Sequence, residues 1–366
     1  MGSMNIRDIA RLSGVGVSTV SRVLNNHPDV NAKTKQKVLR VMNEHNYMPN
    51  NSARNLKRIK SRTIGVVVKG ITNPFFSPML RVIEGELARR GYAMFLTQAD
   101  DFADEIHIAA ELQMERRLEG IIFLGGIFQY SKERLSILKV PFVFATIQVS
   151  SDMEGECYST ISIDDTLEAY RATRYLLERG HRRIGILAGA FEEKSINRLR
   201  LEGYLKALGE YGIGYDEHIH KNCNFTYKGG YEAARSLIRE TDVTAIFAIS
   251  DVMAVGAMRA VLEAGQRIPE DIAIMGFDGL DLTEFTYPGI TTVCQPSEQM
   301  ALEAVTTVLD IIEQKGNHRH SVYPCKIIER GSTGWTEEKI DNGYKGEDLD
   351  REMGEHHDQG KGAVAP

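Results

Sequence analysis

Two patterns of hydrophobic and polar residues divide the chain at about residue 62. Before this point, apolar residues recur every three or four positions over short stretches, which is typical of small amphipathic helices. After it, short and nearly continuous apolar runs alternate with longer amphipathic stretches. This alternation is typical of parallel sheets covered by helices on both faces. We therefore expect a small all-α domain followed by a larger α/β domain.

The first pattern predicts two short helices joined by a tight turn within residues 5–25. Asn5 can cap the first helix, and Gly14 supplies the left-handed conformation that ends it. The buried face of the second helix should consist of Val17, Val20, Val23 and Leu24. Its outward face should carry Ser18, Thr19, Ser21 and Arg22. The pattern indicates a helix-turn-helix with a polar reading face, although a helical hairpin with a merely solvated face would show the same periodicity.

A third helix is expected after Asn31, which can cap it. The residues that should point inward are Val38, Leu39, Met42 and, just beyond, Tyr47. The outer face carries Lys33, Lys35, Lys37 and Arg40. These cations either contact phosphate or form an ordinary solvated face. Residues 50–62 then form a basic segment that is too short to hold a helix without a partner.

The charge is distributed unevenly. Residues 1–62 contain twelve Lys and Arg against three Asp and Glu, a net of +9, whereas the whole chain carries −6, so the remainder carries −15. A basic segment attached to an acidic remainder is the charge distribution expected when one end binds a polyanion such as DNA.

The second pattern places strands and helices along the α/β part. The apolar runs expected to form strands are residues 64–68, 93–96, 120–124, 142–145, 184–187, 245–249 and 273–277. Helices are expected between most of them, for example over residues 75–90, 165–179, 200–210, 230–239 and 252–264. These are too many strands for one compact sheet, and a break near Asp164 indicates two lobes.

Several classes of protein are disfavoured. No apolar run approaches a membrane span and the first residues lack the apolar core of a secretory signal, so we expect a cytoplasmic protein without membrane contact. The four cysteines are far apart and we interpret them as buried free thiols; we expect no metal site and no cofactor. The chain has no complete dinucleotide-binding glycine motif, P-loop or nucleophile elbow, so we predict that it is not an enzyme.

A small-molecule site is better supported. Asp100, Asp251 and Asp278 each follow an apolar strand, and the carboxyl ends of parallel strands are where such sheets bind ligands. Taken singly, each such residue is more often a helix cap or a loop residue, with even odds for Asp251. Ionised acceptors beside an aromatic wall suit the hydroxyls and the apolar faces of a sugar. A sugar or sugar derivative is therefore the favoured ligand, with a sugar phosphate or a purine as alternatives.

Sequence motifs throughout the chain resemble the lactose-repressor (LacI/GalR) family of bacterial transcription regulators. In the first part these are D-I-A at residues 8–10, T-V-S-R-V-L-N at 19–25 and Y-M-P-N at 47–50. In the second part they are G-H-R-R-I-G-I-L-A-G at 180–189, R-L-E-G-Y at 200–204, S-D-V-M-A-V-G-A-M at 250–258, I-P-E-D-I-A-I-M-G-F-D at 268–278, T-T-V-C-Q-P at 291–296 and E-R-G-S-T at 329–333. Together they are highly specific.

The resemblance implies a two-lobed, periplasmic-binding-protein-like core whose chain crosses between lobes near Ile163, Thr292 and Cys325. It also implies a hinge helix that pairs with its dimer mate and wedges Leu56 into the minor groove. The residues expected to contact DNA are Val17, Ser18, Thr19, Ser21, Arg22, Asn50, Ala53 and Leu56.

The resemblance further implies effector contacts from Arg200 and from Phe75 and Phe76, with Phe225 as a weaker candidate. Their ordinary alternatives are a surface salt bridge for the arginine and core packing for the aromatic residues. Two positions depart from the family pattern. Gly16 stands where a serine cap is common, and Ser250 stands where many relatives have asparagine, which puts one ligand hydrogen bond in doubt. The complete set of expected effector contacts is Phe75, Phe76, Asp100, Arg200, Phe225, Ser250, Asp251 and Asp278.

We therefore predict a ligand-controlled transcription regulator, with a repressor favoured over an activator, that binds a pseudo-palindromic operator as a homodimer. The expected parts are a helix-turn-helix domain (1–49), a hinge and linker (50–62), an effector-binding and dimerisation core (63–335) and a disordered tail (336–366). Within the core, lobe one should span about 63–163 and 293–325, and lobe two about 164–292 and 326–335. The alternatives are a sugar-binding protein without DNA function and an α/β enzyme. The operator, the effector and the direction of its influence stay open.

Overall fold

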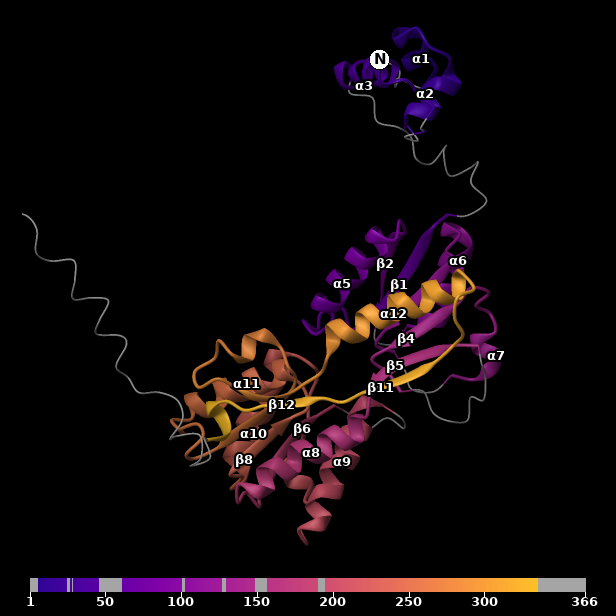
Figure 1. Cartoon of the computed structure of the whole chain (residues 1–366). Helices are drawn as coiled ribbons and strands as arrows, with labels where there is room; N and C mark the ends of the chain where they lie inside the picture. Colours follow the sequence, from indigo (N-terminus) through magenta and orange to yellow (C-terminus); the bar gives the residue numbers. More distant parts are fainter. Residues whose placement is uncertain are drawn as a thin grey trace, which may run out of the picture. The chain divides into compact units, whose positions relative to one another are not determined.

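The computed structural model describes residues 6–24, 27, 29–45, 61–100, 103–126, 130–148, 157–189 and 195–334. The chain divides into two compact units, Met1–Ser61 and Arg62–Pro366, and each is described by itself (Figure 1). The predictions for Asn5, Tyr47, the hinge over residues 50–60 and the tail over 336–366 lie outside the described residues.

The described residues of the first unit form three helices: α1 (Ile6–Ser13), α2 (Val17–Leu24) and α3 (Ala32–Glu44). Its core contains Ile9, Ala10, Val20, Val23, Val38, Val41 and Met42. Gly14 has a φ of +62° between α1 and α2, the left-handed conformation that glycine adopts without steric cost. At the start of α3, the Asn31 side chain accepts a hydrogen bond of 2.9 Å from the backbone N–H of Lys33, as predicted for a cap.

Two residues expected in this core are exposed instead. Val17 is 42% exposed because it is the first residue of α2 and precedes the turn that packs through Val20. Leu39 is 40% exposed, and Val41 takes the inner position. The helical period explains the second error, since residues 38, 41 and 42 share one face while residue 39 lies about 100° away from residue 38.

Within the described residues, the second unit has two six-stranded sheets with the same arrangement of strands. In lobe one the strands are β1 (Thr63–Lys69), β2 (Ala93–Ala99), β3 (Gly120–Leu124), β4 (Phe142–Ala145), β5 (Ser159–Ile163) and β11 (His320–Tyr323), in the spatial order β11-β5-β4-β3-β1-β2. In lobe two they are β6 (Ile184–Ala188), β7 (His220–Asn222), β8 (Ala245–Ala248), β9 (Ala273–Asp278), β10 (Thr291–Cys294) and β12 (Lys326–Ile328), in the order β12-β10-β9-β8-β6-β7. Neighbouring strands run parallel except β10 and β12, which are antiparallel.

Helices cover both sheets, as the alternating pattern predicts. Lobe one carries α5 (Phe76–Arg89), α6 (Glu105–Arg116), α7 (Lys132–Leu135) and α12 (Ser297–Ile312). Lobe two carries α8 (Asp165–Glu178), α9 (Ile196–Glu210), α10 (Tyr227–Glu240) and α11 (Asp251–Glu263). Helix α5 packs beside α12, α8 beside α9 and α10 beside α11 (Figure 1). The predicted fold class, a helix-turn-helix followed by a two-lobed α/β core, is confirmed.

The chain passes between the lobes at three described points: between β5 and α8, between β10 and α12, and between β11 and β12. The ends of β5, β9 and β10 therefore come together near these passages, and the candidate ligand site lies there. All four cysteines carry free thiols. Cys325 is buried as expected, whereas Cys223 and Cys294 are half-buried and Cys157 is exposed, contrary to expectation. In the described part of the chain, no helix is long and apolar enough to span a membrane.

Candidate functional site

The reading helix α2 presents a mixed surface. Val17, Ser18 and Arg22 are exposed, whereas Thr19 and Ser21 are half-buried. The Gly16 carbonyl accepts bonds from the backbone N–H groups at the helix start, so this glycine occupies the cap position despite lacking a side chain. Arg22 remains 60% exposed beside Asp29, at 4.0 Å, which leaves its guanidinium accessible to DNA. The expected contacts Asn50, Ala53 and Leu56 lie outside the described residues.

In lobe two, strand β9 ends at a residue with an unusual backbone conformation. Asp278 has a φ of +120° and Gly279 follows with +80°. A side chain at residue 279 would begin 2.6 Å from the Cα of Cys294, so glycine is required there. Non-glycine residues with positive φ are strained and persist where the surroundings fix them, often at ligand sites. The turn thus holds the Asp278 carboxylate at the end of the sheet.

Asp251 fixes this turn. Its Oδ2 accepts hydrogen bonds from the N–H groups of Gly279 (2.8 Å) and Leu280 (2.7 Å), and its Oδ1 accepts one from the Thr292 hydroxyl (2.7 Å). The side chain is fully buried, and burial, followed by the nearby charge of Asp278, raises its pKa well above the ordinary value. Asp251 therefore positions Asp278.

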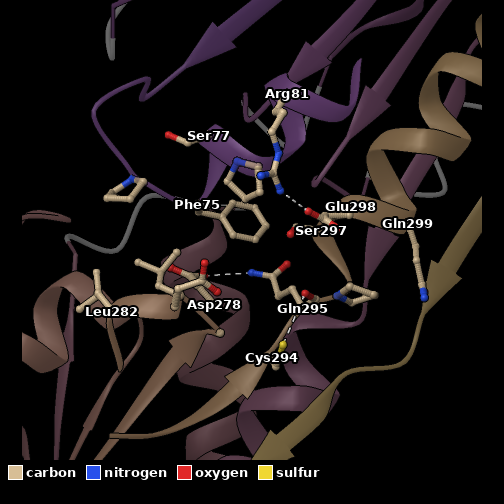
Figure 2. A pocket seen from close by; sticks show the side chains of 16 residues that line it. Phe75, Ser77, Arg81, Asp278, Leu282, Cys294, Gln295, Ser297, Glu298 and Gln299 are labelled. Atoms are coloured by element: carbon tan, nitrogen blue, oxygen red, sulfur yellow. Dashed lines mark hydrogen bonds and ion pairs between the residues drawn. The ribbon is translucent and has the colours of Figure 1, made fainter. Parts of the chain in front are cut away.

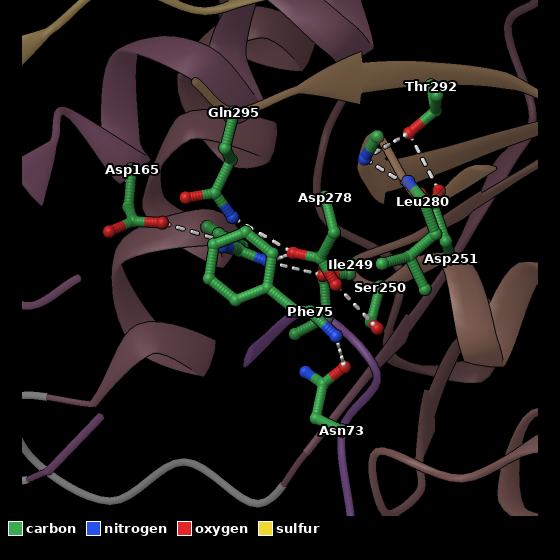
Figure 3. Close-up of polar contacts among 12 residues, drawn as sticks. Asn73, Phe75, Asp165, Ile249, Ser250, Asp251, Asp278, Leu280, Thr292 and Gln295 are labelled. Carbon is green, nitrogen blue, oxygen red and sulfur yellow. Dashed lines mark hydrogen bonds and ion pairs between the residues drawn. The ribbon is translucent and has the colours of Figure 1, made fainter. Parts of the chain in front are cut away.

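Arg200, on α9, bonds to residues of a buried polar cluster. Figure 3 labels its partners Asp165, Ile249 and Asp278. Its Nε donates to Asp165 Oδ1 at 2.9 Å, and its Nη1 donates to the Ile249 carbonyl and lies 3.6 Å from Asp278 Oδ1. The guanidinium also lies 3.6 Å from the centre of the Phe277 ring. Since Arg200 is 1% exposed, its ordinary alternative as a surface salt bridge is excluded.

Asp278 receives two further bonds. Ser250 Oγ donates to its Oδ2 and Gln295 Nε2 donates to its Oδ1, each at 2.9 Å. Burial raises the pKa of Asp278 to about 6, although the charge of Arg200 and these bonds oppose the shift. Burial also raises the pKa of Asp165, against the opposing charge of Arg200.

The cluster retains an unused acceptor. Asp165 is 1% exposed and its Oδ2 has no hydrogen-bond partner among the described residues. A buried carboxylate oxygen without a donor is costly, typically by about 1–3 kcal/mol. The cluster therefore favours a molecule that brings hydroxyl or amine donors to it.

A cleft of about 710 Å³ opens beside the cluster (Figure 2). It lies between the first turn of α5, the loop after β9 and the start of α12. Its lining includes Phe75, Arg81, Asp278, Asp281, Gln295 and Glu298. The Phe75 ring, 5% exposed, lies beside Asp278 and Gln295, where the cleft meets the cluster (Figures 2 and 3). The volume is within the range of about 300–1,000 Å³ that is typical of small-molecule sites.

Comparison with known proteins gives the family. Residues 5–50 match the bacterial regulatory proteins of the lacI family, and residues 173–333 match the periplasmic binding protein-like domain. The HTH-type transcriptional regulator MalR of Clostridium butyricum is 42% identical over 337 residues, which cover 90% of this chain and 99% of MalR. The chain belongs to the LacI family. It is a DNA-binding transcriptional regulator, and its relatives are named as regulators rather than enzymes.

Two solved structures of transcription regulators share the architecture. The lac repressor dimer bound to operator and the anti-inducer ONPF has a TM-score of 0.74 at 25% identity and covers 91% of this chain and 100% of that one. The complex of the transcriptional regulator CelR with cellobiose has a TM-score of 0.65 at 29% identity, covering 90% and 99%.

Within this LacI-family chain, four of the expected effector residues come together: Phe75, Arg200, Ser250 and Asp278. Asp251 does not join them as a ligand contact, because both of its oxygens hold backbone or threonine donors. The doubt about Ser250 has a physical basis, since its hydroxyl already bonds Asp278.

Three other expected contacts lie away from the cleft. Asp100 and Phe225 follow β2 and β7, which are edge strands, so their strand ends are remote from the centre of the sheet where the cleft lies. Asp100 is exposed and Phe225 packs against the core. Phe76 begins α5 and is 7% exposed, with its ring turned toward Gly125 rather than into the cleft.

Two residues of the cluster were missed from sequence. Asp165 follows β5 and Gln295 follows β10, so both stand after central strands that the apolar pattern did not predict. A signal was present: both residues lie beside the predicted lobe crossings near Ile163 and Thr292. Among the described residues, no group of His, Cys, Asp and Glu is placed to hold a metal ion.

Proposed function

We propose that this protein is a cytoplasmic transcriptional repressor that binds a pseudo-palindromic operator as a homodimer, under the control of a sugar bound between its lobes. The observation that carries the effector class is the buried cluster of Asp165, Arg200 and Asp278 with its unused Asp165 oxygen. Carboxylates accept sugar hydroxyls, and the Phe75 ring can cover an apolar sugar face. The cellobiose bound by CelR supports the same class.

The geometry supports a route from effector to DNA. The cluster joins α8 and α9 of lobe two to Gln295, which lies on the passage to α12 of lobe one. A ligand held by Asp278 and covered by Phe75 would touch both lobes, so its affinity depends on their relative position. A ligand that binds one lobe arrangement better than another shifts the population toward that arrangement. In the proposed domain boundaries, the hinge over residues 50–62 connects the DNA-binding domain to the core. A change in the relative position of the two lobes would therefore reach the DNA-binding domains of the dimer through the hinge.

The effector half of the proposal is tested with two variants. Asp278→Asn and Arg200→Lys should lose the thermal stabilisation that wild type gains from a panel of sugars, because a ligand bound by the folded state raises its melting temperature. Both should keep the affinity of the free protein for an operator selected from random duplexes. Glu232→Gln, which removes an exposed carboxylate from α10, is the control and should behave as wild type. Unchanged sugar affinity in both cluster variants would place the effector site elsewhere.

The DNA half of the proposal is tested through Arg22. Arg22→Ala should lose most of its discrimination between operator and random duplex, about 1–3 kcal/mol for one bidentate base contact, while keeping salt-sensitive background binding. Fluorescence anisotropy with both duplexes measures the two affinities. Lys33→Ala on α3, an exposed cation outside the reading face, is the control and should weaken both affinities alike. If Arg22→Ala also weakened both equally, Arg22 would be a phosphate contact.

A further inference from the structure

The basic first part of the chain holds few acidic residues, and one of them lies beside the reading helix. Residues 1–62 contain three side-chain carboxylates, those of Asp8, Asp29 and Glu44. The first and the last pair with arginines of their own helices, α1 and α3, at 3.4 Å and 3.7 Å. Asp29 instead lies 4.0 Å from Arg22 of α2. It is therefore the carboxylate that is paired with an expected base-reading residue.

The turn after α2 holds Asp29 in place from both sides. Before it, the His27 N–H donates to the Arg22 carbonyl at 3.0 Å, so the chain folds back on the last turn of the helix. After it, Val30 packs against the core of the first unit, and the Asn31 side chain caps α3. The carboxylate itself is oriented, because its Oδ1 lies 2.7 Å from His27 Nδ1. Its other oxygen, Oδ2, is thereby presented to Arg22.

The pair of Arg22 and Asp29 suits a cation that must keep its N–H groups for DNA. At 4.0 Å the contact is longer than a hydrogen bond, so the carboxylate attracts the guanidinium without occupying those groups. The two side chains are 60% and 54% exposed, and such a surface pair contributes little to stability by itself. Bound DNA would displace water from both groups, and their attraction strengthens in less polar surroundings. The pair therefore acts mainly in the DNA complex.

A carboxylate at this position also has a disadvantage. DNA carries closely spaced phosphates, so a negative side chain near them lowers affinity for every sequence. Orienting Arg22 would compensate, because a bidentate contact with guanine needs the planar guanidinium in one orientation. An arginine side chain has several rotatable bonds, and fixing it before binding lowers the entropic cost of that contact. The expected result is weaker binding to DNA in general and sharper discrimination between sequences.

We propose that Asp29 is a positioning residue of the reading helix, which orients the Arg22 guanidinium toward a guanine and contacts no base itself. His27 supports it by holding the carboxylate through Oδ1. This inference rests on the reading role of Arg22 in the proposed function, and it adds the residue that makes that role selective.

The first test measures affinity and discrimination separately, on the full chain. Asp29→Ala should bind random duplex about threefold more tightly, because a negative charge is removed, and its preference for the operator should fall about tenfold. Glu44→Ala is the matched control, since it removes a carboxylate paired with the exposed Arg40. It should raise both affinities alike and keep the preference within about twofold. Fluorescence anisotropy with both duplexes gives these values. Equal effects of the two substitutions on the preference would overturn the inference.

A second variant separates the charge of Asp29 from the structure of its turn. Asp29→Asn keeps the shape of the side chain and an oxygen for His27, but it has no charge to hold Arg22. It should lose operator preference nearly as much as Asp29→Ala does. Both variants should melt near the wild-type temperature, because the side chain is exposed. A wild-type preference in Asp29→Asn would mean that Asp29 only stabilises the turn.

The closing experiment identifies the base that is affected. Each base pair of the operator is changed in turn, and the loss of affinity is measured for wild type, Arg22→Ala, Asp29→Ala and the double variant. Asp29→Ala should relax the preference for guanine at the position that Arg22→Ala relaxes. In the double variant it should relax nothing further, because its effect passes through Arg22.

The other outcomes of this scan are distinct. Relaxation at a different base pair would mean that Asp29 reads a base directly, such as the amine of a cytosine, and would overturn the inference. If Arg22→Ala relaxed preferences but Asp29→Ala did not, Arg22 would read DNA without a positioning residue. If Arg22→Ala itself relaxed no position, the reading role assigned to Arg22 in the proposed function would fail.

Discussion

The two lobes share one order of strands but differ in the residues that end their central strands. In lobe one, β4 ends before Thr146, which has a φ of +81°; in lobe two, β9 ends at Asp278, with a φ of +120°. Both sheets thus place a strained residue at the end of the equivalent strand. In lobe one, the Thr146 hydroxyl accepts a bond from the N–H of Gly125, and the Thr146 N–H donates to the Ile161 carbonyl at 2.7 Å. In lobe two, the strained residue is a carboxylate that faces Arg200 and the cleft.

The buried charges of the two lobes differ in the same way. Lobe one has Glu105, which accepts bonds from Lys69 at 3.1 Å and from the Tyr130 hydroxyl. Burial acts to raise the pKa of Glu105, but the bonds from Tyr130 and Lys69 outweigh it and lower that pKa. In lobe two, burial outweighs the opposing interactions and raises the pKa of Asp165 and of Asp278. One Asp165 oxygen has no donor among the described residues. The buried carboxylate of lobe one thus has its hydrogen-bond donors within that lobe. In lobe two, by contrast, a buried carboxylate oxygen is left for a ligand to bond.

Removing the cation from each cluster should give the largest effects. Arg200→Met leaves Asp165 and Asp278 buried without their charge partner, and we expect a loss of about 3–5 kcal/mol in the free energy of unfolding. Lys69→Met in lobe one should cost less, about 1–3 kcal/mol, because Tyr130 still donates to Glu105. Urea unfolding measures both, with the exposed Arg259→Met as a control that changes stability by less than about 0.5 kcal/mol. A smaller loss for Arg200→Met than for Lys69→Met would contradict the comparison.

The positioning role of Asp251 should have the next largest effect. Asp251→Asn keeps one acceptor oxygen and must leave either the N–H groups after Asp278 or the Thr292 hydroxyl without a partner. We expect a loss of about 1–3 kcal/mol in stability together with weaker effector binding, because the turn that presents Asp278 is released. Thr292→Val removes one donor to Asp251 and the longer, 3.3 Å bond from the Gly279 N–H, but leaves both backbone bonds to Asp251 in place. It should retain effector affinity within about threefold. Normal effector affinity in a folded Asp251→Asn variant would show that the turn holds without it.

How far sequence predicts this site depends on the strands. The runs that became β1, β3, β4, β6, β8 and β9 are continuously apolar, and they were placed correctly. Strands β5 (S-T-I-S-I) and β10 (T-T-V-C) were not predicted, because half of their residues carry hydroxyl groups although nearly all are buried. Most of those hydroxyls bond distant partners, as Thr292 bonds Asp251 and Thr291 bonds Thr333, whereas Ser162 Oγ has no partner among the described residues. Missing these strands meant missing Asp165 and Gln295, which follow them.

The order of the strands across each sheet was the second limit on predicting the site residues. Asp100 was a candidate because it follows a predicted strand, and Phe225 was a weaker one from the family resemblance. The sequence does not show that β2 and β7, which precede them, are edge strands. Phe75 and Phe76 were proposed as a pair, yet adjacent residues at the start of a helix point in directions about 100° apart, so one lines the cleft and the other fills the core. The family motifs pointed to Arg200, Ser250 and Asp278. Which of the other expected residues lie at the cleft depends on how the strands and helices pack.

Effector binding should depend on pH through lobe two. The pKa of Asp278 in the folded protein is about 6, above the ordinary value for Asp, so its carboxylate is ionised above that pH and protonated below it. Sugar hydroxyls that donate to the carboxylate favour the ionised form, and affinity should fall by up to about tenfold per pH unit below 6. In the unfolded chain Asp278 ionises at its ordinary, lower pKa. Its contribution to the free energy of unfolding therefore falls as pH rises from about 4 to 6. Calorimetry from pH 5 to 8 measures the first effect, and Asp278→Asn should be weak at every pH. A pH-independent affinity would show that the ligand does not bond Asp278.

The smallest expected effect tests whether the strained residue of lobe one is merely structural. Thr146 is 7% exposed, and a β-branched residue with positive φ carries a steric cost of about 1–2 kcal/mol. Asparagine tolerates this conformation and keeps an oxygen for the Gly125 N–H, so Thr146→Asn should raise the free energy of unfolding by about 1 kcal/mol. Thr146→Gly relieves the same strain but leaves that N–H without its acceptor, and it should gain less.

Urea midpoints of the three proteins give the order, and calorimetry adds the functional contrast. Both Thr146 variants should bind effector as wild type does, because their turn lies at the end of β4, away from the residues that line the cleft. Asp278→Asn alters the equivalent turn of lobe two and should lose that binding. If Thr146→Asn were less stable than wild type, the backbone of lobe one would hold no strain to release. If it also changed effector affinity, the turn of lobe one would belong to the effector site. The proposed difference between the lobes, a structural turn in lobe one and a ligand-binding turn in lobe two, would then be wrong.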